Sequence, residues 1–262
     1  ASVVNQGEFL TVEIGRTELI NLSFIPEISL IEKKPVFEIE NNIALGDNTA
    51  PGILDIKLPV SLFGLHGENQ IIAVMDTGFD TGNTGTIHAD FAGRITAHFG
   101  YGRGGAPANS NWNDTDGHGT HVAGSVFGNG AAFNGNIANV VNGQVRGAAY
   151  MSQLVTQSVI DVDGGLGGLP ADLKTGLDDA KNSGATIQTN SWGGGCPSGY
   201  TLNAQQVDKF LYENPEFTVL FAAGNHFNCS GNVVASRPIA SLLSPAVAKN
   251  TITVGATENL RP

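Results

Sequence analysis

The chain has 262 residues, 41% of them hydrophobic and 14% charged, which is enough to bury one large core or one core with an appendage. Its formal net charge of −11 argues against nucleic acid and anionic membrane surfaces as partners. No apolar run in the sequence reaches the roughly 18 residues of a membrane-spanning helix. Ala1 onward lacks the basic start and apolar run of a signal peptide, which fits a leader already removed.

The first 40 residues predict a small α+β unit. The stretch 9–14 alternates as a strand does, 17–24 predicts a short helix, and 27–40 is expected to be extended, so the unit should be βαβ-like. Turn-forming residues fill the stretch 46–52. We therefore place a boundary near residue 41, between a segment 1–40 and a larger domain 41–262.

Strands and helices are expected to alternate beyond this boundary. The apolar stretch 70–75 is typical of a buried parallel strand, and Asp76 follows it directly. Similar patterns predict strands at 153–160, 185–191, 217–223 and 251–254, and helices at 171–182 and 203–212. The fold class is therefore α/β, a parallel sheet with helices on both faces. Ligands bind beyond the carboxyl ends of such strands, where Asp76, Ser191 and Asn225 are expected.

Residues 116–125, Asp-Gly-His-Gly-Thr-His-Val-Ala-Gly-Ser, carry the candidate catalytic base. Gly117 and Gly119 leave room for backbone or substrate beside the imidazole of His118, and the residues that follow predict a helix. Taken alone, His118 or His121 would more often be structural. A metal site of the HExxH type is a poor match, because the two histidines are three apart rather than four and no glutamate accompanies them.

Asp76 and Asn225 are the candidate partners of this base. A carboxylate at the end of a buried strand needs a partner, and a histidine N–H is a suitable one because the contact fixes the tautomer and stabilises the imidazolium. Asn225 follows Ala222, Ala223 and Gly224 after another strand, where its NH2 group can donate to a developing oxyanion. Taken alone, Asp76 also fits an Asx turn, and the asparagine segment is a weak signal.

Two glycine-bearing segments are candidate edges for an extended peptide, which would add to them as a β-strand. The first is Gly164-Gly165-Leu166-Gly167-Gly168, and the second is Ser191-Trp192-Gly193-Gly194-Gly195. Taken alone, each of these segments is simply a turn.

Together the segments closely resemble those of subtilisin-like serine proteases, the subtilases. Met-Asp-Thr-Gly-Phe-Asp, the His118 segment, Thr-Asn-Ser-Trp-Gly-Gly and Phe-Ala-Ala-Gly-Asn occur here in the order of that family. The resemblance covers residues 41–262 and implies that Asp76 and His118 belong to a Ser-His-Asp triad, with Asn225 as oxyanion donor. The segment Ile-Thr-Val-Gly-Ala-Thr resembles the extracellular alkaline subtilases with a C-terminal β-sandwich. A secreted endopeptidase acting on proteins or peptides is implied.

The resemblance stops short of the nucleophile. Subtilases carry the catalytic serine in a Gly-Thr-Ser-Met-Ala-type segment downstream of Ile-Thr-Val-Gly-Ala-Thr, and residues 1–262 contain none. Ser191, Ser198 and Ser244 lie in other sequence contexts. We therefore expect an incomplete catalytic domain that is inactive by itself, its serine supplied elsewhere, for example by a second polypeptide. The alternative is a noncatalytic relative that only binds peptide.

The resemblance further implies roles for the segment 1–40 and for the substrate pockets. Residues 1–40 are loosely similar to the latter half of a subtilase propeptide, whose tail would lie across both glycine edges as a third strand, with the scissile bond between Glu38 and Ile43. The ranges 191–193 and 222–224 would line a first pocket. Trp192 and Leu166 would wall a second, apolar pocket, so large apolar substrate side chains should be preferred.

The cysteines and a metal complete these expectations. In a secreted protein Cys196 and Cys229 are expected to form a disulfide, with two unrelated thiols as the alternative. No cofactor is required. Calcium is common in subtilases, and acidic loops such as Asp161-Val162-Asp163 are candidate contributors, but the sequence contains no calcium-loop pattern and no ligand is assigned.

Overall fold

The computed structural model describes eleven ranges of the chain, namely 2–6, 9–15, 18–22, 24–28, 31, 37–39, 65–104, 110–131, 146–194, 199–225 and 242–256. The chain divides into two compact units, Ala1–Pro35 and Val36–Pro262. The boundary predicted near residue 41 lies outside the described ranges. Within those ranges, no helix has both the length and the apolar character that crossing a membrane requires.

The first unit begins with an antiparallel hairpin. Strand β1 (Ser2–Gln6) pairs with β2 (Phe9–Glu13) in a register from Ser2 opposite Glu13 to Gln6 opposite Phe9, and the short helix α1 (Glu18–Leu22) follows. The strand predicted at 9–14 and the helix predicted at 17–24 are thus present as β2 and α1, whereas β1 was not predicted. Only two residues separate β1 from β2, and such a short connection favours an antiparallel neighbour over a crossover.

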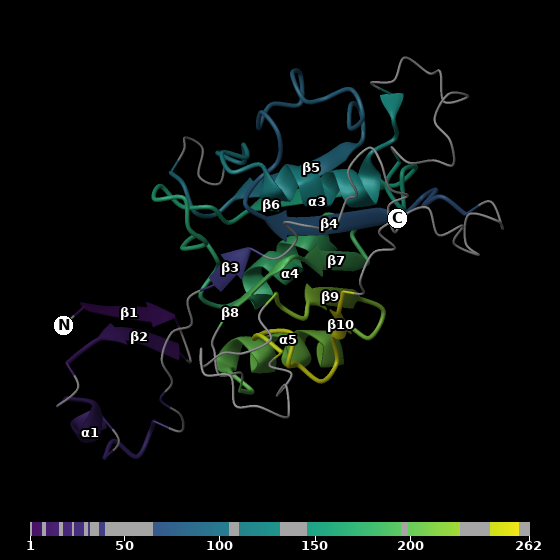
Figure 1. Ribbon diagram of the computed structural model, residues 1–262. Coiled ribbons are helices and arrows are strands. Elements are labelled where there is room, and N and C mark those ends of the chain that lie inside the picture. The colour runs from purple at the N-terminus through teal and green to yellow at the C-terminus, as the bar shows by residue number, and fades with distance from the viewer. Residues whose placement is uncertain are drawn as a thin grey trace, which may run out of the picture. The chain divides into compact units, whose positions relative to one another are not determined.

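The second unit is built on a six-stranded sheet, whose neighbouring strands are all parallel (Figure 1). From one edge to the other its strands are β10 (Ile252–Val254), β9 (Thr218–Ala222), β7 (Ile187–Asn190), β4 (Ile71–Asp76), β6 (Gln153–Ser158) and β5 (Ile95–Gly100). The strand β4 is first in sequence yet lies between β6 and β7, so the chain continues to both sides of it. This is the switch point at which open α/β sheets bind ligands.

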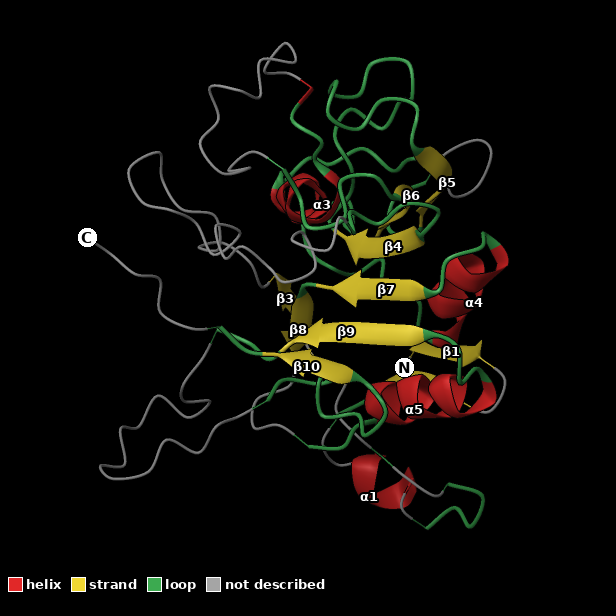
Figure 2. Ribbon diagram, turned by 90° about the vertical axis from the view of Figure 1, so that its right-hand side faces the viewer, coloured by secondary structure: helices red, strands yellow, loops and turns green. Residues whose placement is uncertain are grey.

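Strand β4 separates two apolar cores, because its side chains alternate between the two faces of the sheet. Ile72 and Val74 belong to a cluster with buried residues of helix α3 (His118–Phe127). Ala73 and Met75 belong to a larger cluster with helices α4 (Lys174–Asn182) and α5 (Leu202–Glu213). Figure 2 shows α3 on one side of the sheet and α4 and α5 on the other. The predicted fold class is confirmed.

A separate two-stranded ladder joins residues far apart in sequence. Strand β3 (Phe37–Ile39) pairs antiparallel with β8 (Trp192–Gly194), with Glu38 opposite Gly193 (Figure 1). The predicted pairing of the 36–40 tail with the second glycine edge is thereby confirmed. The ladders of the described residues include none between β3 and the first edge, 164–168. On its other side Gly194 forms a bridge with Ser244, through two hydrogen bonds with N to O distances of 2.9 and 3.0 Å.

Candidate active site

The carboxyl end of β4 and the first residue of α3 bring Asp76 and His118 together. The Asp76 Oδ1 atom lies 2.7 Å from Nδ1 of His118, although the two residues are 42 positions apart in the sequence. Both side chains are buried, with 1% of Asp76 and 4% of His118 exposed. This close approach needs Gly119, since a Cβ at that position would lie 2.3 Å from the carbonyl oxygen of Gly78. The sequence-predicted acid and base are therefore in contact.

The hydrogen bonds of Asp76 fix the tautomer of the imidazole. Its Oδ1 atom accepts from the Thr77 backbone N–H at 2.7 Å as well as contacting His118 Nδ1. We assign the proton to Nδ1 of His118, the ring nitrogen that faces this carboxylate oxygen, so that Nδ1 donates and Oδ1 accepts. The other ring nitrogen, Nε2, is then left as an acceptor.

Burial and the hydrogen bond act in opposite directions on this pair. Burial raises the pKa of the Asp76 carboxyl, and the hydrogen bond with His118 opposes that rise. For His118, burial disfavours the imidazolium, but the hydrogen bond and charge of Asp76, with the nearby charges of Asp116 and Asp114, outweigh burial and raise its pKa. A His118 that has lost its proton at Nε2 is a stronger base than free histidine.

The Nε2 atom of His118 is buried and has no hydrogen-bond partner among the described residues. A buried polar atom without a partner costs about 1–3 kcal/mol, so a ligand that supplies a hydrogen bond to Nε2 would remove this cost. A hydroxyl group about 3 Å from Nε2 would satisfy the nitrogen and could give up its proton to it. His118 is therefore placed to act as a general base towards a hydroxyl group near Nε2.

Two residues that the sequence did not single out support the pair. The Thr77 hydroxyl donates to Asp114 Oδ1 at 2.9 Å and accepts from the Gly119 N–H at 2.8 Å. The Asp114 carboxylate also accepts from the Gly117 N–H at 2.9 Å and the Thr120 N–H at 2.8 Å. Only the position of Asp114 four residues before His118, in a run of turn formers, hinted at this role.

Asn225 is exposed, three residues beyond the end of β9. Ser191 is partly buried between β7 and β8. Both therefore lie just past the carboxyl ends of strands in the sheet that holds Asp76.

Gly164, in the first glycine edge, has φ of +83°, a left-handed backbone conformation that glycine adopts without strain. The Asp161 carboxylate supports this first edge by accepting from the backbone N–H groups of residues 163, 165 and 167.

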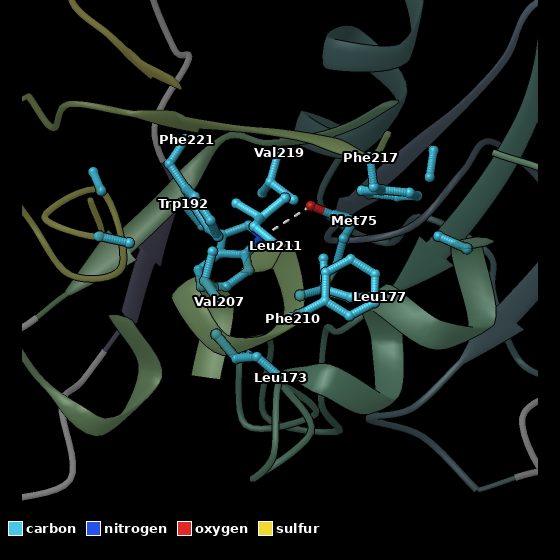
Figure 3. Packing of buried hydrophobic residues seen from close by; sticks show 14 of the residues in the cluster. Met75, Leu173, Leu177, Trp192, Val207, Phe210, Leu211, Phe217, Val219 and Phe221 are labelled. Carbon is cyan, nitrogen blue, oxygen red and sulfur yellow. Dashed lines mark hydrogen bonds between the residues drawn. The ribbon is translucent and has the colours of Figure 1, made fainter. Parts of the chain in front are cut away.

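Trp192 and Leu166 were expected to wall a second, apolar pocket, and the structure places both side chains in the apolar core. Trp192 is 1% exposed, stands edge-on to Phe221, and donates from Nε1 to the Met75 carbonyl oxygen at 2.9 Å (Figure 3). Leu166 is buried in the same cluster. A strand directs successive side chains to opposite faces, and β8 directs Trp192 into the core. The backbone of Trp192 still pairs with β3, opposite Ile39.

Leu243 is a further residue that the sequence did not single out. A Cβ on Gly193 would lie 2.9 Å from Leu243 Cβ, and a Cβ on Gly224 would lie 2.8 Å from Leu243 Cγ. This buried side chain therefore contacts both of the backbone ranges expected to line the first pocket, 191–193 and 222–224. No local pattern reveals the contact, because 50 and 19 residues separate Leu243 from the two glycines.

The expected disulfide and metal ligands are not established by the described residues. Cys196, Cys229, Gly195 and Ser198 lie outside the described residues. Within the described ranges, no group of three His, Cys, Asp or Glu side chains could hold a metal ion.

Ser244 does not fit a nucleophile. It is fully buried, and its hydroxyl is hydrogen bonded to that of Thr201.

The chain is similar to known proteins over most of its length. The subtilase family pattern matches residues 67–261. An alkaline protease of Shouchella clausii is 30% identical over 250 residues, 95% of this chain and 54% of the relative. Subtilisin BL of Lederbergia lenta is 33% identical over 195 residues, 74% of this chain and 58% of the relative.

Other relatives are longer. A Dictyostelium discoideum protein, serine protease/ABC transporter B family protein tagB, is 31% identical over 73% of this chain, which spans only 10% of that protein. Among solved structures, the psychrophilic subtilisin-like protease Apa1 of Pseudoalteromonas matches with a TM-score of 0.48 and 22% identity, over 72% of this chain and 36% of that one. From the family pattern and the bacterial relatives, this chain belongs to the subtilase family of serine proteases.

Proposed function

We propose that the chain carries the acid, the base and the oxyanion donor of a secreted serine endopeptidase. The observation that carries the proposal is the buried Asp76–His118 pair at 2.7 Å, in which Nε2 has no partner within the part of the chain that the structure describes. In this role His118 accepts the hydroxyl proton of a serine as that oxygen attacks the peptide carbonyl, and Asp76 stabilises the imidazolium. His118 then returns the proton to the leaving amine.

The nucleophile has to be supplied from outside residues 1–262. No Gly-Thr-Ser-Met-Ala segment occurs in them, and the burial of Ser244 supports its exclusion as a substitute. We propose that a serine-bearing segment, on the same or a second polypeptide, completes the site, and that residues 1–262 alone do not turn over peptides. In the complete site Asn225 donates its side-chain N–H to the oxyanion, for which its exposed place beyond β9 is suitable.

The substrate is a protein or peptide bound in extended form. The backbone of β8 is a strand edge that pairs with β3, and this supports its use for an extended substrate as well. Neither backbone range of the first pocket contributes a charge, so specificity is broad and apolar. Because Leu243 occupies space between those ranges, we propose that it limits the size of the side chain accepted there.

The segment 1–40 acts as part of a propeptide in this proposal. Its tail occupies the β8 edge through the Phe37–Ile39 strand, the place where substrate would bind, so it inhibits until it is cut between Glu38 and Ile43. Without the serine that bond stays intact. Sequencing the N-terminus of the completed enzyme tests this, since processing near residue 41 supports a propeptide and an active enzyme still starting at Ala1 rules it out.

The experiment on function compares residues 1–262 alone with the same residues joined to the serine-bearing segment of a bacterial relative. Peptide hydrolysis and labelling by a serine-directed phosphonate are expected only for the joined protein. His118→Ala should remove hydrolysis, by about 10⁶-fold if the loss is as large as in subtilisin. His121→Ala, on the same helix, is the matched control and should retain it.

The main competing function is noncatalytic peptide binding. It predicts no hydrolysis by the joined protein and peptide binding that His118→Ala leaves unchanged. A binder has no use for a buried acid–base pair with a free Nε2, which is why we favour the peptidase.

A further inference from the structure

We propose that Asp114 is the positioning residue of the Asp76–His118 pair, because its carboxylate fastens the end of β4 to the start of α3. The proposal rests on the proposed function, in that it concerns the same base. It assigns to Asp114 no contact with substrate or with the reacting atoms.

The Asp114 carboxylate is the meeting point of five donors. Its Oδ1 atom accepts from the Thr77 hydroxyl at 2.9 Å, the Gly117 N–H at 2.9 Å and the Asp116 N–H at 3.2 Å. Its Oδ2 atom accepts from the Thr120 N–H at 2.8 Å and the Thr120 hydroxyl at 2.6 Å. A single side chain therefore satisfies three backbone N–H groups around the first turn of α3, which the helix itself cannot satisfy.

These contacts fix the backbone on both sides of His118 and next to Asp76. Gly117 and Thr120 bind Asp114 directly, and Gly119 donates to the Thr77 hydroxyl that Asp114 holds. Thr77 is the residue after Asp76 and donates its own N–H to the Asp76 carboxylate. The two catalytic candidates thus share one anchor, and a shift of that anchor changes the distance between them.

Asp114 is itself held in place and charged. Its N–H donates to the Asp80 carbonyl at 2.9 Å, and the backbone N–H of Asp80 donates to the Thr120 hydroxyl at 2.8 Å, which closes a ring of contacts. Burial alone would raise the pKa of Asp114, but the hydrogen bonds from Thr120, Gly117 and Thr77 outweigh it and lower the pKa. The other charged groups that face this region are Asp76 and Asp116, which are acidic, and Arg103, which is basic.

An asparagine cannot replace this carboxylate. Its NH2 group would face either the Thr120 N–H and hydroxyl or the three donors at Oδ1. A hydroxyl can turn to accept, but a backbone N–H cannot. At least one N–H then loses its acceptor, and the first turn of α3 loosens where His118 begins.

The test observes the Nδ1 proton of His118 by NMR in the chain of residues 1–262. The signal is identified by its loss in His118→Ala, and its exchange with solvent reports how firmly the pair is held. We expect Asp114→Asn and Thr77→Val to accelerate exchange by about tenfold or more, since each removes hydrogen bonds to or from the charged anchor. Thr77→Ser keeps the bridging hydroxyl and should stay within about twofold of the wild type.

Two control variants separate positioning from charge and from general stability. Asp116→Asn removes a negative charge near His118 but keeps the side-chain oxygen that accepts the His118 N–H. It should lower the His118 pKa as Asp114→Asn does, without faster exchange. Asp208→Asn alters a carboxylate of α5 that accepts two backbone N–H groups and the Tyr200 hydroxyl, and it should leave the Nδ1 signal unchanged.

The proposal is overturned if folded Asp114→Asn or Thr77→Val exchanges within about twofold of the wild type, or if Asp208→Asn accelerates exchange equally. Should Asp114→Asn fail to fold, the Thr77→Val and Thr77→Ser pair decides alone. The proposed function fails separately, through absent hydrolysis by the serine-completed protein. That result would leave the exchange pattern, and with it the positioning role, intact.

Discussion

Gly119→Ala tests how tightly α3 must approach β4. The added Cβ would lie 2.3 Å from the Gly78 carbonyl oxygen, 2.9 Å from the Gly78 nitrogen and 3.1 Å from Asp76 Cβ. These atoms belong to backbone or to a buried carboxylate, so α3 has to retreat by about 1 Å to restore normal contacts. Overpacking costs about 1–3 kcal/mol, offset by up to about 1 kcal/mol because alanine favours helix over glycine. The same retreat would stretch the 2.7 Å Asp76–His118 contact beyond hydrogen-bond range.

Gly124→Ala is the matched control on the same helix. Its Cβ would have only Phe91 Cζ nearby, at 4.0 Å, so it should stabilise the chain by up to about 1 kcal/mol. Urea unfolding followed by fluorescence measures both variants, because Trp112 and Trp192, the only two tryptophans in the sequence, are buried. A Gly119→Ala variant as stable as Gly124→Ala, with the His118 Nδ1 signal intact, would refute the reasoning.

Three further predictions concern the pair, the core and the pocket. Because the His118 pKa is raised, the stabilisation from its contact with Asp76 is fully present below the ordinary histidine pKa of about 6.5 and is lost as pH rises through the folded-state pKa. NMR titration checks this, and a midpoint at or below the ordinary value would contradict it. Trp192→Phe removes the donor to the Met75 carbonyl and should lower the unfolding free energy by about 1–3 kcal/mol in urea denaturation, whereas an unchanged midpoint would show the bond to be dispensable. In the serine-completed enzyme, Leu243→Ala should shift cleavage of a peptide library towards larger apolar side chains, and an identical profile would remove Leu243 from the pocket.

The central strands were predictable because strands that are buried on both faces tend to consist of consecutive apolar residues. Strands β4 and β9 appear where such runs occur, with ends shifted by a few residues, whereas β6 and β7 mix apolar with polar residues. Strand β5 lies at the edge of the sheet, and its residues alternate between partly buried and exposed, so Ile95–Gly100 gives no such run. The hairpin β1–β2 escaped prediction because the first strand, Ser2–Gln6, ends in polar residues.

The acid–base pair was predictable from short motifs, but its support was not. Asp76 follows a buried strand and His118 is flanked by glycines, and both patterns are typical of an acid–base pair. In the sequence Asp114 is one of several turn-forming residues, and its support of the pair depends on a contact with Thr77, 37 residues away. Trp192 was placed at a pocket by resemblance to the subtilase family, and the sequence alone did not show that β8 directs its side chain into the core.

The β3–β8 ladder is only three residues long, and so short a pairing would be weak between separate molecules. Ile39 is covalently joined to β4 through residues 40–70, however, so the pairing is intramolecular and is governed by an effective concentration that dilution of the protein does not change. A free peptide of the same sequence would have to approach that concentration to compete for β8. Cutting the chain between β3 and β4 would abolish this advantage at once, and dilution would then separate the two strands.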